Sequence, residues 1–268
     1  MTDGTQKTSE LRQKIISKLI SFGYVQDSNG KFKPPNSLDK NSIRIFHEDR
    51  RYHVLHSNRE WINKKEEKIF DFFANGEDID VNSISPKLIE VQKTLWHRDL
   101  FRYVTYLWSI PVSQGYGRRM RYLVMDSSNN KLIGIFGLSD PVIGLKTRDD
   151  WIGWSKDQKE DRLWHILDAY ILGAVPPYNI LLGGKIVAAL LTCNEVRHDF
   201  RRKYENRKAV ISGKKRKGHL VLVTTNTAIG HTRKLKLSCS FLCGIYTINS
   251  TPTYAPFLPR STILISGV

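Results

Sequence analysis

The chain has 268 residues, with 42 Lys and Arg against 26 Asp and Glu, which gives a formal charge of +16 at pH 7. Its apolar fraction of 40% and charged fraction of 25% are ordinary for a globular protein, and its length suits one large domain or a core with a small N-terminal module. The excess of cations is not ordinary. It predicts a preference for polyanions, with nucleic acid first and an anionic membrane surface second.

The apolar segments and the cysteines argue against a membrane-spanning or disulfide-stapled protein. The start, MTDGTQKTSELRQ, lacks the apolar stretch of a signal peptide. The longest apolar run, residues 180–191, is interrupted by Lys185 and is too short to cross a bilayer. Three cysteines in a chain of this size favour a reducing compartment. We therefore expect a cytoplasmic protein with no membrane partner.

The N-terminal sequence predicts a helix, a turn and a second helix. Asn29-Gly30 is typical of a tight turn or short hairpin. This order fits a winged-helix module that presents Arg44, Arg50 and Arg51 to a phosphate backbone. It also fits a helical extension that packs on the core. The first helix is expected over residues 9–22 because apolar residues recur there at helical spacing, namely Leu11, Ile15, Ile16, Leu19 and Ile20.

Two further helices are expected before residue 110. One has its apolar positions between residues 62 and 73 and ends at Asn75-Gly76. The other begins with Ser85 as N-cap and Pro86 in the first turn, and it runs to Trp108. Residues 1–110 are therefore predicted to form a mostly helical N-terminal region.

Residues 117–154, GRRMRYLVMDSSNNKLIGIFGLSDPVIGLKTRDDWIGW, carry the most informative pattern of the chain. Apolar strands over residues 122–125 and 132–138 flank the turn sequence DSSNN, which predicts a β-hairpin. A corner of charged and aromatic residues follows, consisting of Asp140, Arg148, Asp149, Asp150, Trp151 and Trp154.

This corner has two interpretations. Asp140, Asp149 and Asp150 are three carboxylates that would suit a divalent metal in a nuclease. However, the Glu-x-Lys strand of a PD-(D/E)xK nuclease is missing, and Arg148 lies beside two of the carboxylates. An ion-paired structural corner is therefore the favoured interpretation.

A second candidate catalytic pair lies downstream. Ser155 is predicted to cap a helix that runs through Ala169, which places His165 and Asp168 three residues apart on one face. The pair is either a general base with its orienting carboxylate or a histidine bonded to its neighbour. The candidate catalytic residues are thus Asp149, Asp150, His165 and Asp168. Cys239 and Cys243 lack partners at zinc spacing, so no metal site is expected.

Gly183-Gly184-Lys185 opens a predicted helix over residues 186–191, and we expect it to continue through the charged stretch to Tyr204. Free backbone N–H groups, a helix N-terminus and a lysine form an anion site, which is one interpretation. Two glycines that let a helix pack closely on a strand are the other. Residues 220–225 are β-branched and apolar, as in a central strand. Helices followed by mixed elements indicate an α+β fold with a mixed sheet core.

Basic residues concentrate near the end of this core. Residues 201–217 hold nine Lys or Arg and one acid, Glu205. A solvated helix face would interleave acids, so the pattern favours phosphate contact. With the basic entry to the hairpin, the predicted nucleic-acid-binding residues are Arg118, Arg119, Arg201, Arg202, Lys203, Lys214, Lys215, Arg216 and Lys217.

The C-terminal end differs from the rest of the chain. Residues 206–268 contain no Asp or Glu, and the last forty residues have little helical period. We expect this tail not to complete the core, so that the edge of the strand over residues 220–225 stays open.

The hairpin block and the segment LDAYILGAVPPYNILLGGKIVAALL of residues 167–191 resemble the DruA family, a bacterial group named from the Druantia antiphage defence system. The resemblance covers roughly residues 11–230 and is densest from Gly117 to Lys203. It implies a cytosolic prokaryotic protein of phage defence that works with other defence proteins. It stops near Gly230, which predicts three regions: the helical region 1–110, a DruA-like core 111–230 and a divergent tail 231–268.

The element order hairpin, helix, strand, glycine turn, helix and strand also resembles the GNAT acetyltransferases, in which such a turn holds the coenzyme A pyrophosphate. The leading functional expectation is a nucleic-acid-binding component of antiphage defence. The alternative is an enzyme on a GNAT-like acyltransferase core, with an anion or coenzyme A site at Gly183, Gly184 and Lys185. The sequence indicates no other cofactor.

Overall fold

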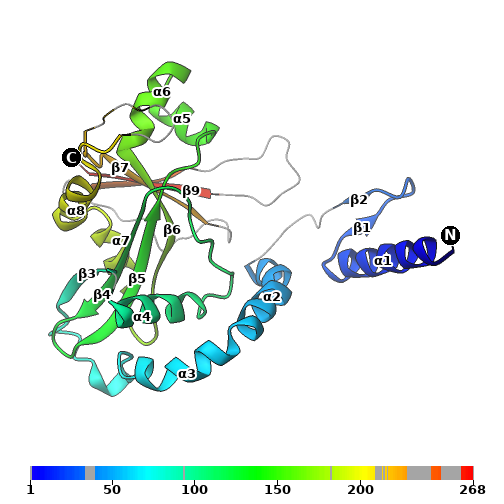
Figure 1. Cartoon of the computed structure of the whole chain (residues 1–268), viewed down its shortest axis with the longest axis horizontal. Coiled ribbons are helices and arrows are strands. Elements are labelled where there is room, and N and C mark those ends of the chain that lie inside the picture. Colours follow the sequence, from blue (N-terminus) through cyan, green and yellow to red (C-terminus); the bar gives the residue numbers. More distant parts are fainter. Residues whose placement is uncertain are drawn as a thin grey trace.

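A seven-stranded mixed sheet forms the centre of the structure, which is a computed structural model (Figure 1). It describes residues 2–33, 40–92, 94–181, 183–208, 213, 215, 217–227, 243–248 and 261–267. Neighbouring strands are antiparallel except for one parallel pair, β6 with β7. In sheet order the strands are β3 (Pro86–Glu90), β4 (Arg119–Asp126), β5 (Lys131–Ser139), β6 (Ile166–Ala174), β7 (Leu222–Thr227), β9 (Ser261–Gly267) and β8 (Cys243–Ile248).

Helices cover both faces of the sheet. The described helices are α1 (Thr2–Ser21), α2 (Lys40–Ser57), α3 (Arg59–Phe70), α4 (Leu95–Thr105), α5 (Lys146–Ile152), α6 (Lys156–Arg162), α7 (Gly183–Leu190) and α8 (Asn194–Tyr204). The result is the predicted α+β fold, with a helical N-terminal region followed by a mixed sheet.

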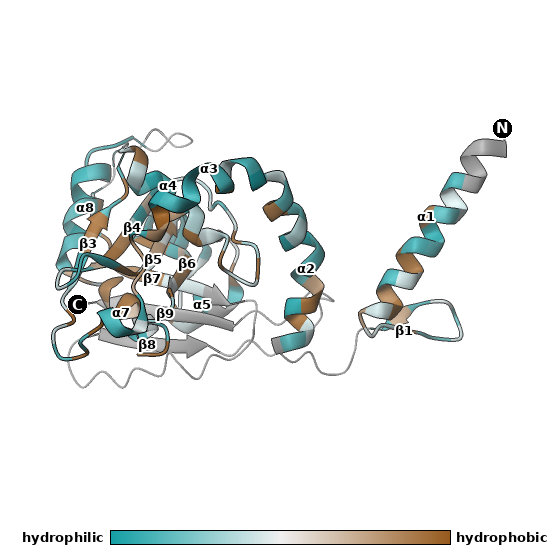
Figure 2. Ribbon diagram, turned by 90° about the horizontal axis from the view of Figure 1, so that it is seen from below, coloured by the Kyte–Doolittle hydropathy of each residue, from teal (hydrophilic) through white to brown (hydrophobic). Residues whose placement is uncertain are grey.

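The alternation of side chains along β4 and β5 divides the core in two. Tyr122 and Val124 point to the face that α7 and α8 cover, where Phe200 is buried. Leu123 and Met125 point to the opposite face, which α3 and α4 cover. Figure 2 shows the hydrophobic residues concentrated on these central strands. Because both faces are buried there, the middle of the two strands, residues 122–125 and 132–138, contains no charged residue.

The N-terminal helix and hairpin lie apart from the sheet (Figures 1 and 2). The predicted hairpin at Asn29-Gly30 is present as the short strands β1 (Val25–Gln26) and β2 (Phe32–Lys33). This unit contacts α2 where the ring of Phe46 meets those of Phe22 and Tyr24, and where Lys18 pairs with Asp49. Among the described helices, none combines the length and the apolar character that a membrane span requires.

The predicted β-hairpin is confirmed, and the carboxylate of Asp126 organises its turn. One oxygen accepts hydrogen bonds from the backbone N–H groups of Ser85 and Ser128, each 3.0 Å long. The other accepts from the hydroxyl of Tyr178 at 2.8 Å. Burial alone would raise the pKa of Asp126, but these donors outweigh it and lower the pKa. Burial raises the pKa of Tyr178 to about 12, so its hydroxyl remains a donor at neutral pH.

The helix predicted to begin at Ser85-Pro86 is wrong in its first half. Residues 86–90 form β3, the edge strand beside β4, and the helix begins only at Leu95. Proline is tolerated at the first position of an edge strand because no ladder hydrogen bond is lost there. The local signal for a helix cap was therefore overridden by pairing with β4.

The helix predicted over residues 155–169 is also too long. Ser155 caps α6 as expected, and its side chain accepts from the N–H of Gln158. The helix ends at Arg162, a single 3₁₀ turn follows, and Ile166 already belongs to β6. The continuous helix up to Tyr204 likewise consists of two helices, α7 and α8.

The C-terminal tail contributes two strands to the sheet. β9 pairs with β7 from Leu222 opposite Ser266 to Thr227 opposite Ser261, and β8 pairs with β9. The expectation of an open edge at β7 was therefore wrong. The tail sequences CGIYTI and STILISG are rich in β-branched residues, which suits strands although they lack helical period.

Removing the hydroxyl that serves Asp126 tests the importance of this turn. We expect Tyr178→Phe to lower the free energy of unfolding by about 1–3 kcal/mol, because a buried carboxylate oxygen loses its donor. Urea denaturation at pH 7 measures the change. Tyr116→Phe, at an exposed tyrosine, is the matched control. Equal stability of the two variants would contradict the prediction.

Candidate nucleic-acid interface

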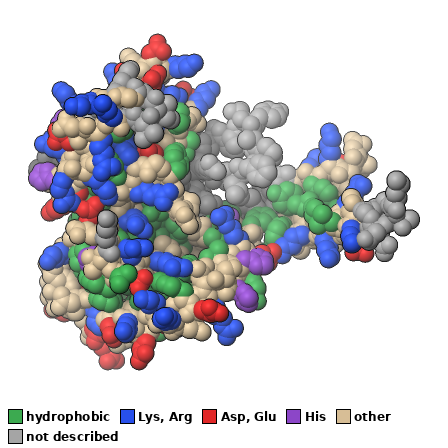
Figure 3. Space-filling view, viewed as in Figure 1, with side chains coloured by type: hydrophobic (Ala, Val, Ile, Leu, Met, Phe, Trp, Pro, Cys, Tyr) green, Lys and Arg blue, Asp and Glu red, His purple; other side chains and the backbone are tan. Residues whose placement is uncertain are grey.

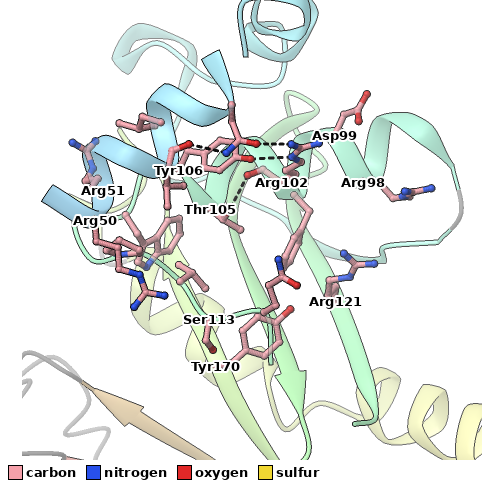
Figure 4. A pocket seen from close by; sticks show the side chains of 18 of the residues that line it. Arg50, Arg51, Arg98, Asp99, Arg102, Thr105, Tyr106, Ser113, Arg121 and Tyr170 are labelled. Atoms are coloured by element: carbon pink, nitrogen blue, oxygen red, sulfur yellow. Dashed lines mark hydrogen bonds between the residues drawn. The ribbon is translucent and has the colours of Figure 1, made fainter. Parts of the chain in front are cut away.

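A cleft of about 640 Å³ opens between α2, α4 and the strands β4 and β6. Figure 4 shows its walls, with Tyr170 between Arg50 on one side and Arg121 on the other. We call it the arginine cleft, because every cation among its described lining residues is an arginine. Its lining includes Arg50, Arg51, Asn58, Arg98, Asp99, Phe101, Arg102, Tyr106, Trp108, Gln114, Arg119, Arg121 and Tyr170.

The charge of the arginine cleft is strongly unbalanced. Six arginines line it, two each from α2, α4 and β4, and Asp99 is the one acid among the described lining residues. The carboxylate of Asp99 pairs with Lys65 at 2.8 Å, so its charge is already compensated by a lysine of α3. Cations converging on a concave surface concentrate the positive potential there, which attracts anions.

Some of these arginines are held by the protein and others are not. The guanidinium of Arg102 donates to Asn58 and Tyr106 and lies 4.0 Å from the ring centre of Trp61. By contrast, Arg50, Arg98 and Arg121 form no ion pair with any residue that the structure describes. The Nε of Arg51 is buried without a hydrogen-bond partner among the described residues. The arginine cleft therefore offers charge that no acid among the described residues neutralises.

Tyr170 forms part of the floor of the cleft. Its ring lies on Gly137, where an added Cβ would come within 2.6 Å of the ring, so a side chain there would displace Tyr170. Burial raises the pKa of Tyr170, although Arg121 and Arg119 act in the opposite direction. The hydroxyl is therefore protonated at neutral pH, and it has no hydrogen-bond partner among the described residues.

The predicted cations of α8 lie on the other face of the sheet. Arg202 pairs with Glu90 at 2.7 Å and with Asp199 at 2.6 Å. Lys203 pairs with Glu90 at 3.2 Å and donates to the carbonyl of Arg119 at 2.9 Å. These contacts partly neutralise the charge that the sequence pattern predicted to be free. The residues Arg201, Arg202 and Lys203 are called the α8 cluster below.

The remaining predicted cations follow α8. Lys208 forms an isolated antiparallel bridge with Lys215, which is exposed, as is Lys217. Lys214 and Arg216 lie outside the described residues. Figure 3 shows Lys and Arg side chains outnumbering acidic ones across the middle of the visible face.

Arg118 was predicted to bind nucleic acid, but its side chain is only 10% exposed. It donates to Asp140 at 2.6 Å and to the carbonyls of Trp164 and Ile166 at 2.6 and 3.1 Å. It also lies over the ring of Trp164, 4.3 Å from the ring centre. All its nitrogens thus serve internal contacts, so Arg118 is not part of the interface described here.

The corner after the hairpin is an ion-paired structure, as favoured from the sequence. Arg148 is fully buried and donates to one oxygen of Asp149 at 2.6 and 2.9 Å. Lys159 contacts the other oxygen of Asp149 at 3.0 Å. Asp150 is exposed. Over the residues that the structure describes, no group of three His, Cys, Asp or Glu is placed to hold a metal ion.

The predicted helical pair of His165 and Asp168 does not form, because Asp168 lies in β6. His165 ends the 3₁₀ turn, and its Nδ1 lies 2.8 Å from the carbonyl of His219. One oxygen of Asp168 accepts from the hydroxyl of Thr224 on β7 at 2.8 Å. Their spacing in the sequence suggested a shared helix face, and strand formation removed it.

Gly183-Gly184-Lys185 begins α7 as predicted, but Gly183 serves packing. Its N–H donates to the carbonyl of Tyr178 at 2.9 Å, and an added Cβ would come within 2.6 Å of that oxygen. This geometry supports the interpretation that the glycine lets the helix pack closely. Lys185 and Gly184 are partly exposed and do not line the arginine cleft.

Comparison with known proteins gives one strong and one weak similarity. A family model described as "Druantia protein DruA" matches residues 37–240. A curated protein of that description from Escherichia coli (strain UMEA 4076-1) is 40% identical over 234 residues, which are 86% of this chain and 58% of that protein. The chain therefore spans less than two thirds of the length of this relative.

Among solved structures, a spermidine/spermine N-acetyltransferase from Vibrio cholerae, crystallised with manganese ions, is similar over 69% of this chain and 93% of its own. The two share 13% identity at a TM-score of 0.32. A similarity of this size carries no argument about acyl transfer.

The buried ion pair of the corner can be tested through its acid. We expect Asp149→Ala to lower the free energy of unfolding by about 3–5 kcal/mol, because the buried guanidinium of Arg148 loses its carboxylate. Chemical denaturation measures this cost. Asp150→Ala removes the exposed neighbouring acid and should change stability by no more than about 0.5 kcal/mol. A small effect of both substitutions would show that the corner does not depend on this pair.

Proposed function

Because the chain belongs to the DruA family, we propose that it is a component of a prokaryotic antiphage defence system that binds nucleic acid and acts with partner proteins in the cytoplasm. The observation that carries nucleic-acid binding is the arginine cleft, in which α2, α4 and β4 contribute two arginines each. Arginine is suited to phosphate because its planar guanidinium donates two parallel hydrogen bonds.

Three further observations support the proposal. The charge of +16 favours association with polyanions. The basic run of residues 201–217, which begins with the α8 cluster, adds nine Lys or Arg that do not line the arginine cleft. The chain belongs to the DruA family, which is named from the Druantia antiphage defence system, and this supports a role in defence.

The arginine cleft can be tested through the salt dependence of binding. We expect the triple substitution Arg50→Ala, Arg98→Ala and Arg121→Ala to make the negative slope of log K against log salt shallower. The decrease in its magnitude should be up to about 2.7, which is about 0.9 for each lost phosphate contact. Fluorescence anisotropy with a labelled oligonucleotide at several salt concentrations measures the slope.

The control removes three exposed lysines that do not line the cleft, Lys64, Lys68 and Lys87, by substitution with Ala. It lowers the net charge by the same amount. If both triple variants change the slope equally, net charge rather than the arginine cleft determines binding, and the proposed role of the cleft fails.

The basic run after α8 makes a separate prediction. Replacing Lys214, Lys215, Arg216 and Lys217 with Ala should weaken binding. It should also reduce the magnitude of the slope of log K against log salt by up to about four units, because four cations are lost. The same anisotropy measurement applies, and circular dichroism verifies the fold. An unchanged slope would remove this segment from the interface.

A further inference from the structure

We infer that the arginine cleft accepts a single unpaired nucleic-acid strand, with one backbone phosphate held between Arg119, Arg121 and the hydroxyl of Tyr170. This inference rests on the proposed nucleic-acid binding and adds which form of nucleic acid the cleft takes.

The placement of the cations indicates a strand that enters the protein. The arginines stand on three elements around a hollow, and Figure 4 shows Arg50 and Arg121 on opposite sides of it. A protein that reads duplex DNA instead inserts a protruding helix or ribbon into a groove about 12 Å wide. The volume of about 640 Å³ lies within the range of pockets that enclose a small ligand, so it suits nucleotide units rather than a double helix.

The phosphate position follows from the groups around Tyr170. Arg121 is the partner of Gly137 in the register of β4 and β5, and the ring of Tyr170 lies on Gly137. An added Cβ on Gly115, whose carbonyl accepts from Arg119, would come within 3.0 Å of the ring of Tyr170. The hydroxyl is protonated and has no partner among the described residues, and Arg121 forms no ion pair there. One Nη of Arg119 donates to the carbonyl of Gly115 at 3.0 Å, which orients its guanidinium. Two cations and a neutral donor match the several oxygens of a phosphodiester.

Aromatic rings accompany the cations in the lining. Tyr106, Trp108 and Tyr170 are partly exposed there. Trp108 is held against the sheet, because an added Cβ on Gly173 would come within 2.8 Å of its ring. Unpaired bases stack on such rings, whereas paired bases in a duplex do not expose their faces. Arg50 and Arg98 lie on the two helical walls, where the phosphates on either side of the first would pass.

The test uses the full chain and two labelled probes, a single-stranded oligonucleotide and the duplex of the same sequence. An unlabelled mononucleotide serves as competitor. Tyr170→Phe removes only the hydroxyl, and Arg121→Gln removes only the charge. Tyr116→Phe is the matched control because Tyr116 is exposed and does not line the cleft. Thermal denaturation verifies that each variant folds.

We expect Tyr170→Phe to weaken single-strand binding about fivefold and Arg121→Gln about tenfold or more, as for the loss of hydrogen bonds to a charged group. Duplex binding should change less than about twofold, because the cleft is inferred not to accept a double helix. Tyr116→Phe should leave both unchanged.

Each other outcome has one meaning. If the unmodified protein binds neither oligonucleotide, the proposed function itself fails. If it binds, but the two cleft variants bind the single strand normally, the inference is overturned and the proposed function stands. Equal losses for single strand and duplex would overturn strand selectivity. A mononucleotide that binds as tightly as the strand would show that the ligand is a free nucleotide.

Discussion

The structure depends on the burial of β4 and β5 on both faces. Their apolar side chains require one helical layer on each side, supplied by α3 and α4 on one face and by α7 and α8 on the other. The first residues of β4 are less covered than its middle. Arg119 and Arg121 therefore line the cleft on the face of the sheet that α4 covers. The arginine cleft thus lies at the boundary where the helical cover of the sheet stops. Its position is a consequence of how the core is closed.

Neighbouring arginines on β4 and in the loop before it have opposite roles. Arg118 is surrounded by Asp140, two carbonyls and an aromatic ring, which compensate its charge inside the protein. Arg121 has no ion pair among the described residues. Counting basic residues along the chain treats the two alike. The difference is that the fold brings an acid, Asp140, to Arg118, although the two residues lie 22 positions apart in the chain. No described acid forms an ion pair with Arg121.

The sequence predicted the elements whose signals are local, and it failed where distant pairing decided. The hairpin, the cap at Ser155 and the first turn of α7 follow from residues within a few positions of each other. β3 and the first four residues of β6 were predicted as helix because their strand character comes from neighbours in the sheet. Three of the cleft arginines were predicted from the sequence to contact phosphate, namely Arg50, Arg51 and Arg119. Arg98 and Arg102 were missed, although their spacing of four residues places them on one face of α4.

Arg119 connects the two cationic surfaces. Its side chain lines the arginine cleft, while its backbone carbonyl accepts from Lys203 and from the hydroxyl of Tyr204 on α8. Its N–H donates in turn to that hydroxyl at 2.9 Å. The α8 cluster is thereby fixed to β4, the strand that carries two of the cleft arginines. The α8 cluster and the arginine cleft therefore keep a fixed relative position, because both are attached to the same backbone unit.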